Sequence, residues 1–462
     1  MTRMHRREVL KAAAAAAVAP IVLPSRLFAA AAPSEQLKIA VIGLGGRARG
    51  VIGDGLRSPD YRLAAVCDIF KPRVDSYVAQ FNKDHAGGPI KGYTRISEML
   101  DREQLDGVMV QTTTHARAWC VIQCLKRGID TYIEKPMCLT IEEGRAMVDA
   151  ARKHKCVTQV GTQQRSIPLN NWACDLIQAG AIGKVRVVEA PNFIGPMEWD
   201  DKPAQQMPDG GSDDWWDIWT NAAELRPYHQ ELHYGWARWS DYDAGGLCFG
   251  VSGWGTHSYD QVQRGLGTSD TVPTAILLEE KMETRDSGRF GQRQIGDDET
   301  GAPYYGMAKL SGPRARITMR YANGAELRLH LDGDRGPGLG CIFVGTSGKI
   351  EVNRDKISAN PKQLLAGDDR PKTLGELGFS ETQPHIQNWL DCIKSREKAN
   401  ADVEYGHYST MICNLVNAVR ETGLVGKTLQ WDPKAERFTN CDEANENRWI
   451  KRPRRKGYEL DV

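Results

Sequence analysis

A short apolar run that ends in a glycine-rich turn constrains the fold of this chain more than any other feature. Residues 38–50 read KIAVIGLGGRARG, and residues 38–42 have the β-branched, apolar character of a buried parallel strand. Gly43, Gly45 and Ala48 occupy the positions of a G-x-G-x-x-G/A fingerprint. The segment therefore predicts a strand, turn and helix that bind a dinucleotide, with its phosphates at the helix N-terminus. An ordinary turn whose glycines only relieve backbone strain is the alternative.

A carboxylate follows the turn at the spacing that a nucleotide ribose requires. A second predicted strand, residues 62–67, ends at Asp68, about 20 residues after the turn. This carboxylate suits the ribose diol and favours NAD, because it repels the 2′-phosphate of NADP. Lys71 and Arg73 follow closely, and either side chain suits such a phosphate, so NADP stays an alternative.

The first 32 residues have the layout of an export signal. They combine a basic start, an Ala-rich apolar middle and small residues that suit a signal peptidase near positions 29–32. The Arg6-Arg7 pair resembles a twin-arginine signal, which exports proteins that are already folded. We expect a periplasmic or secreted protein that carries its cofactor along. Pro20 and Pro24 interrupt the short apolar stretch, so no permanent membrane span is expected.

Composition narrows the class of partners. Sixty Lys and Arg residues nearly balance 59 Asp and Glu residues, and the net charge of +1 gives no footprint for nucleic acid. The 11 cysteines form no CxxC pair, and several lie in apolar runs, so we expect free buried thiols. No motif indicates a metal site. The sequence favours an enzyme that acts on small molecules.

The pattern of predicted elements indicates two domains after the leader. Strand and helix patterns alternate over residues 33–157, which predicts an N-terminal Rossmann domain with a doubly wound parallel sheet. Longer alternating runs over residues 158–462, with an Asn323-Gly324 hairpin turn, predict a C-terminal α/β domain. Its sheet is expected to be large, open and mostly antiparallel. The predicted fold class is α/β.

Chemistry-bearing side chains gather at three places. Residues 132–138 read YIEKPMC and place Glu-Lys-Pro at a strand end, where doubly wound folds bind ligands. Residues 160–165 read VGTQQR, again at a strand end, and offer amide and guanidinium groups to substrate hydroxyls. Residues 245–260 read GGLCFGVSGWGTHSYD and lead into a helix that carries His257 and Asp260.

These motifs, taken in order, resemble the Gfo/Idh/MocA oxidoreductases, the family of glucose-fructose oxidoreductase and inositol dehydrogenase. The resemblance covers nearly everything after the leader. The chain is also similar to an exported branch of that family through GTQQRS at 161–166, a Trp-rich stretch at 215–239 and ADVEYGH at 401–407. The resemblance implies a Rossmann domain, a C-terminal sheet that is often used for oligomerisation, and a nicotinamide held between them. We therefore expect a homo-oligomer.

The resemblance also implies roles for individual residues. The lysine matching Lys135 and the histidine matching His257 flank the reacting carbinol, where the histidine takes the hydroxyl proton and the lysine holds the alkoxide. A Lys135 that pairs with an acid and a His257 that caps its helix are the alternatives. The predicted cofactor contacts are Gly43, Gly45, Gly46, Arg47, Ala48, Asp68, Thr112, His115, Glu134 and Lys135. The predicted substrate contacts are Gln163, Arg165, Trp254 and Asp260.

One position departs from the pattern of the family. Family members commonly carry an aspartate four residues before the histidine, and this sequence has Gly253 there. Either another carboxylate replaces it, with Asp260, Asp243 and Asp241 as candidates, or the role of the histidine differs.

A tryptophan-rich stretch allows two interpretations. Seven of the 12 tryptophans lie between residues 199 and 254, among many Asp, Gly and Pro residues, and the stretch predicts an irregular lid. The indoles either stack on sugar rings or pack a long loop against the core or an oligomer partner.

Three functions are consistent with these observations. The first is a nicotinamide-dependent oxidoreductase that takes a hydride from a secondary alcohol of a sugar, cyclitol or glycoside with a tightly bound cofactor. The second is a redox-neutral, NAD-dependent enzyme that cleaves glycosides by oxidation, elimination and re-reduction. The third is a non-catalytic carbohydrate-binding protein.

Overall fold

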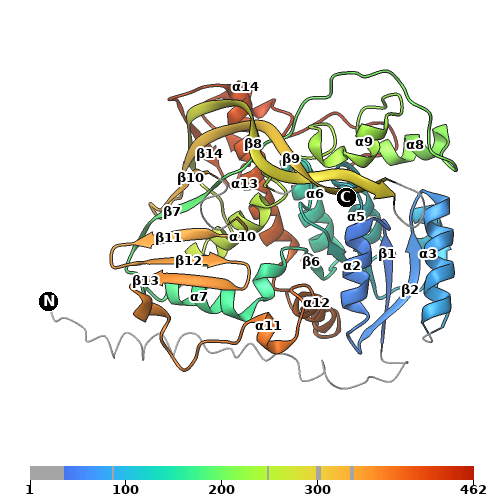
Figure 1. The fold of residues 1–462 in the computed structure, drawn as a ribbon, viewed down its shortest axis with the longest axis horizontal. Helices are drawn as coiled ribbons and strands as arrows, with labels where there is room; N and C mark the ends of the chain where they lie inside the picture. Colours follow the sequence, from blue (N-terminus) through green and yellow to red (C-terminus); the bar gives the residue numbers. More distant parts are fainter. Residues whose placement is uncertain (1–35, 86–87, 247–248, 298–302, 333–337) are drawn as a thin grey trace.

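The structure is a computed structural model that describes residues 36–85, 88–246, 249–297, 303–332 and 338–462 (Figure 1). The predicted export signal lies outside the described residues. Among the described residues, no helix has the length and apolar character that a membrane crossing requires. No group of three or more His, Cys, Asp or Glu side chains in this part of the chain is placed to hold a metal ion. The described cysteines are free.

The first sheet is parallel and has six strands in the order β3-β2-β1-β4-β5-β6. Its strands are β1 (Leu37–Ile42), β2 (Tyr61–Cys67), β3 (Lys91–Tyr93), β4 (Gly107–Val110), β5 (Asp130–Ile133) and β6 (Thr158–Val160). The helices between them are α2 (Gly46–Gly55), α3 (Lys71–Asp84), α4 (Ile96–Arg102), α5 (Thr114–Leu125) and α6 (Ile141–Lys153). The strand order reverses between β1 and β4, which places the ligand-binding switch point at their carboxyl ends. The predicted Rossmann topology is confirmed.

The N-terminal domain recruits a helix from the far end of the chain. Helix α12 (Gln383–Ser395) lies beside α2 (Figure 1). Its Trp389 and Leu390 share one buried cluster with Ile39 and Val41 of β1. The sheet itself continues past the predicted boundary at residue 157, because β6 pairs with β5.

The second sheet has nine strands in the order β13-β12-β11-β7-β10-β9-β8-β14-β15. They are β7 (Val185–Asn192), β8 (Ala275–Asp297), β9 (Pro303–Arg320), β10 (Glu326–Asp332), β11 (Cys341–Gly345), β12 (Lys349–Asn353), β13 (Lys356–Asn360), β14 (Thr428–Asp432) and β15 (Arg437–Phe438). Among the described ladders of this second sheet, only the one between β7 and β10 is parallel. The Asn323-Gly324 turn joins β9 to β10, with Gly324 at φ +85°. The mostly antiparallel sheet is therefore confirmed.

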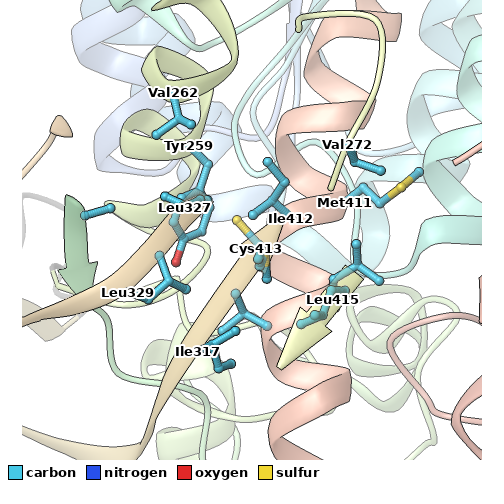
Figure 2. Packing of buried hydrophobic residues seen from close by; sticks show 14 of the residues in the cluster. Tyr259, Val262, Val272, Ile317, Leu327, Leu329, Met411, Ile412, Cys413 and Leu415 are labelled. Carbon is cyan, nitrogen blue, oxygen red and sulfur yellow. The ribbon is translucent and has the colours of Figure 1, made fainter. Parts of the chain in front are cut away.

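Helices cover one face of this sheet and form the main core of the domain. They are α7 (Pro168–Gln178), α10 (Gly255–Leu266) and α13 (Val403–Thr422). Figure 2 shows Tyr259 of α10 and Ile412 of α13 against Ile317 and Leu327 of the strands. This packing fixes the position of α10, the helix that carries His257. The remaining helices are short: η2 (Gln163–Ser166), α8 (Asp213–Thr220), α9 (Gln230–Tyr234), η3 (Trp236–Arg238), η4 (Lys362–Leu365), α11 (Leu374–Leu377) and α14 (Asp442–Asn445).

The tryptophan-rich segment is more regular than the lid that its composition predicts, because it contains α8, α9 and η3. Trp215, Trp216, Trp219 and Trp239 are buried and share a cluster with Phe70, which follows β2. The structure therefore supports the packing interpretation for these four indoles. They hold the segment against the N-terminal domain.

Candidate active site

The glycine turn has the geometry that an anion at the start of α2 requires. Gly43 has φ +89°, and a Cβ there would lie 2.8 Å from the carbonyl oxygen of Gln111, so only glycine fits. A Cβ on Gly45 or Gly46 would meet nothing within 4 Å. Helix α2 begins without a side-chain cap, which leaves its first amides available. The open backbone and uncapped amides fit the pyrophosphate of a dinucleotide.

Asp68 connects the turn to the end of β2. Its Oδ2 accepts from the Leu44 amide at 2.8 Å, and its Oδ1 accepts from the Phe70 amide at 2.9 Å. Arg73 lies 3.2 Å from the same carboxylate, whereas Lys71 pairs with Asp75 at 2.5 Å on the exposed side of α3. Arg73 Nη1 donates to both oxygens, at 3.4 Å to Oδ1 and 3.2 Å to Oδ2, so each oxygen accepts one backbone amide and one guanidinium N–H. Of the two basic residues considered for NADP, Arg73 is thus the one at Asp68.

Arg47 joins the glycine turn to two other strand-end segments. Its Nε lies 3.3 Å from Glu134 Oε2, and its Nη2 donates to Thr382 Oγ1 at 3.4 Å. With its amide oriented to satisfy both neighbours, Gln163 donates to the Gly161 carbonyl and accepts from Arg47 at 3.2 Å. The structure thus brings together three predicted residues. Their mutual bonds fix the start of α2 against the Glu-Lys-Pro loop.

Lys135 reaches from the end of β5 to the segment that leads into α10. Its Nζ donates to the carbonyl oxygen of Gly253 at 3.0 Å. Burial lowers the pKa of Lys135, although the nearby Glu134 carboxylate partly offsets that effect. Buried Arg117 fixes the backbone around the lysine, because it donates to the carbonyls of Thr112 and Pro136. Thr112, a predicted cofactor contact, also has a buried hydroxyl without a partner among the described residues.

His257 lies on the first turn of α10, four residues after the carbonyl that Lys135 contacts. The ring is 3 % exposed, and its Nδ1 is buried without a hydrogen-bond partner in the described part of the chain. Burial lowers its pKa well below the usual range, and the nearby Arg354 and Lys135 act in the same direction. The neutral imidazole is therefore the form present near pH 7. A neutral ring with an unpartnered nitrogen can accept a proton from a bound hydroxyl.

Of the three carboxylates considered as replacements for the family aspartate, Asp243 is the one linked to the lysine. It is fully buried and accepts from Thr114 and from Ser252, each at 2.5 Å. Ser252 immediately precedes Gly253, whose carbonyl holds Lys135. Burial raises the pKa of Asp243, and the two hydroxyl donors partly offset the effect. Asp241 instead pairs with Arg226, 3.2 Å away in the tryptophan-rich segment.

The structure corrects two predicted substrate contacts. Arg165 and Asp260 form a buried ion pair, in which Arg165 Nε lies 2.8 Å from both carboxylate oxygens. Asp260 also accepts from Ser409 at 2.8 Å, and Arg165 contacts Ser269. The pair joins η2 to α10 and α13, so both side chains are committed to packing. Sequence spacing missed this because the partners are far apart in the chain.

His115 also lies elsewhere than predicted. Its ring is buried between Trp219 and Tyr242, with centroids 4.9 and 4.7 Å away, and its Nε2 contacts the Trp219 carbonyl at 2.9 Å. These contacts make it part of the aromatic cluster and do not support the predicted cofactor contact. The partly buried Trp254 packs at a tilt against Phe249, with ring centroids 4.0 Å apart, directly before α10. It lies near His257 in the chain, and its substrate contact stays a prediction.

Arg354 is a site residue that the sequence did not indicate. It lies in the tight turn between β12 and β13, and its Nη1 donates to Glu381 at 2.8 Å. The neighbouring Thr382 accepts from Arg47, so Arg354 and Arg47 converge on adjacent residues. No motif marks a lone arginine in a hairpin turn, and its proximity to the site depends on the packing of two domains.

Two family models match the chain. Residues 37–162 match the Gfo/Idh/MocA oxidoreductase family, NAD-binding Rossmann fold, and residues 307–460 match the C-terminal alpha/beta domain of the same family. The chain belongs to the Gfo/Idh/MocA oxidoreductase family. Its N-terminal domain is accordingly an NAD-binding Rossmann domain.

Individual relatives share part of the sequence. The rhizopine catabolism protein MocA of Rhizobium meliloti is 26% identical over 168 residues, covering 36% of this chain and 49% of that protein. A glycosyl hydrolase family 109 protein of Shewanella baltica (strain OS195) is 27% identical over 229 residues, with 43% and 48% coverage. The scyllo-inositol 2-dehydrogenase (NAD(+)) of Bacillus subtilis is 28% identical over 154 residues, with 32% and 42% coverage. The chain thus spans about half the length of these relatives.

The fold extends over nearly the whole of a solved relative. The aldose-aldose oxidoreductase of Caulobacter crescentus superimposes with a TM-score of 0.56, covering 86% of this chain and 99% of that chain at 17% identity. At this identity the match shows the two-domain fold alone.

Proposed function

We propose that the chain is an NAD-dependent oxidoreductase that takes a hydride from a secondary alcohol of a sugar, cyclitol or glycoside. The observation that carries the proposal is the meeting of Lys135 with the entry to α10, where the unpartnered Nδ1 of His257 is buried. The inositol dehydrogenase among its relatives supports this substrate class.

The protein residues of the site account for binding and proton transfer. Bound NAD would be held by Gly45, the α2 amides and Asp68, and it supplies the hydride acceptor. Neutral His257 would take the hydroxyl proton of the alcohol, and protonated Lys135 would stabilise the oxygen as negative charge develops there. Asp243 would hold Lys135 in place through the Ser252-Gly253 segment.

The test is turnover by Lys135→Ala measured beside its nucleotide content. We expect NADH formation from a panel of cyclitols and aldoses to fall by about 10²-fold or more, with the nucleotide retained. Arg316→Gln is a matched control, because it removes an exposed cation of β9 that pairs with Glu280. Wild-type rates in Lys135→Ala would refute the assigned role.

A second function, redox-neutral glycoside cleavage, is favoured by two observations. Relatives of glycosyl hydrolase family 109 match the chain, and at position 253 a glycine carbonyl contacts Lys135 where the family commonly has a carboxylate. In this reaction, oxidation of a secondary alcohol to a ketone acidifies the neighbouring C–H. Loss of that proton expels the glycoside oxygen, water adds to the resulting alkene, and the hydride returns to the ketone.

The two functions differ in what accumulates. Cleavage releases the aglycone from a p-nitrophenyl glycoside without net NADH. When the reaction is run in D2O, the product carries deuterium at the carbon that lost its proton. Stoichiometric NADH from a simple polyol, with no aglycone release, supports the first function against the second.

We also propose export by the twin-arginine route and assembly into a homo-oligomer through the open C-terminal sheet. The Arg6-Arg7 leader supports export with the cofactor already bound. Fractionation of cells that express the Arg6→Lys, Arg7→Lys double variant tests the route, since the variant should stay in the cytoplasm.

Light scattering of the mature protein tests assembly into a homo-oligomer, and a monomer at all concentrations would refute it.

A further inference from the structure

Arg354 has an unused donor edge close to the proposed catalytic histidine. Its Nη1 is occupied by Glu381 at 2.8 Å, but its Nε is buried and has no partner among the described residues. Nε and Nη2 together form the edge that binds a carboxylate or phosphate through two parallel hydrogen bonds. Because an unsatisfied buried donor is costly, the open edge calls for an acceptor.

The surrounding contacts connect the turn of Arg354 to the helix that carries His257. Asp355, the next residue, donates its amide to Asn170 Oδ1 at 3.1 Å, and Asn170 donates to Gln261 at 3.2 Å. Gln261 lies one helical turn after His257 on the same face of α10. A short chain of hydrogen bonds thus connects the turn that carries Arg354 to the helix of the histidine.

The position of Arg354 is rigidly defined. Asn353 accepts from the Arg354 amide at 2.8 Å, and Asp355 accepts from the Leu374 amide at 2.9 Å. Glu381 holds one end of the guanidinium, so little rotamer entropy is left to lose on binding. A fixed fork of this kind discriminates ligands by charge and shape.

We propose that Arg354 binds an anionic substituent, a carboxylate or a phosphate, on the sugar that is oxidised. The proposal rests on the proposed function and narrows its substrate class from sugars in general to acidic sugars. The ring hydroxyl would face His257 and Lys135, while the acidic group would lie against Nε and Nη2 of Arg354.

The test compares sugars that differ only in the group at carbon 6. Glucuronate, galacturonate and mannuronate are each paired with the neutral aldose of the same configuration, and glucose, galactose and mannose 6-phosphates form a second arm. We expect a preference of about 10- to 100-fold in kcat/KM and in calorimetric affinity for one anionic arm, the size of a charge-assisted hydrogen bond. The arm that shows it identifies the acidic group.

Three variants distinguish a role of Arg354 in binding the substrate from a purely structural role of its ion pair with Glu381. Arg354→Gln should lose that preference through KM, so that kcat/KM falls about 10- to 100-fold more for the acidic sugars than for their neutral partners. Glu381→Gln should keep the preference or increase it, because it frees a second edge of the arginine, and Arg316→Gln should resemble the wild type. Retained nucleotide should be equal in all of them. Equal losses on neutral and acidic sugars in both Arg354→Gln and Glu381→Gln would show a structural ion pair and overturn the inference.

The other outcomes are also decisive. If no acidic sugar of the panel binds more tightly than its neutral partner, or if Arg354→Gln loses nucleotide while the sugar preference persists, the inference is wrong. Calorimetry gives this answer even without turnover. NADH formation from neutral aldoses with no charge preference refutes this inference alone, whereas absence of bound nucleotide and of any NADH refutes the oxidoreductase proposal.

Discussion

The Gly45→Val variant tests NAD binding by the glycine turn independently of the folding of that turn. Gly45 has φ −67°, which valine tolerates, and an added Cβ would meet no protein atom within 4 Å. The open space belongs to the pyrophosphate if the turn binds a dinucleotide. Gly45→Val should therefore fold but fail to bind NAD.

The expected magnitudes differ enough to be distinguished. Valine is a poor residue at the start of a helix, and the exchange costs about 1 kcal/mol of stability at most. A phosphate oxygen must approach an amide to within about 2.9 Å, and a valine side chain excludes it. The loss of two charge-assisted hydrogen bonds costs about 3–6 kcal/mol, which weakens NAD binding by about 10²- to 10⁴-fold.

The assay is nucleotide release on denaturation, quantified by mass spectrometry, together with thermal unfolding. Gly53→Val is the matched control, because Gly53 is an exposed residue of the same helix with nothing within 4 Å of an added Cβ. It should retain nucleotide as the wild type does. Added NAD should raise the melting temperature of the control but not that of Gly45→Val. If Gly45→Val purifies with a full complement of NAD, the assignment of the turn is wrong.

Three further predictions follow from the buried polar groups. Because burial keeps His257 neutral, the acid limb of the kcat/KM profile should lie well below pH 6.5, and His257→Asn should lower the rate by about 10²- to 10⁴-fold. Arg165→Met should destabilise the protein by about 3–5 kcal/mol, measured by urea unfolding, and Asp260→Asn in that background should recover part of the loss. Two buried histidines, His115 and His385 of α12, have pKa values that burial lowers to about 4, so the folded protein binds these protons more weakly than the unfolded chain does. Each should therefore cost about 1.4 kcal/mol of stability per pH unit as the pH falls from 6.5 to about 4, seen as a lower urea midpoint.

Local patterns predicted the turn, the Glu-Lys-Pro loop and the helix of His257, because each is defined within a short stretch of chain. The same patterns misjudged Arg165 and Asp260. Their side chains have the right chemistry for substrate hydroxyls, but they satisfy each other across 95 positions of sequence. A buried charge must find a partner, and a sequence does not show which charges meet.

The amino-acid order was sufficient for the α/β class and for the strand, turn and helix around Gly43. These follow from β-branched runs and glycine conformations, which are local properties of the backbone. The resemblance to the family is what singled out Lys135 and His257 for their proposed roles. Contacts between distant elements place Arg354 and Asp243 at the site. They also bury four of the tryptophans in one packed cluster, and His115 contacts Trp219 of that cluster. Such contacts depend on how two sheets and their helices pack, and burial then selects the charge and the partner of each side chain.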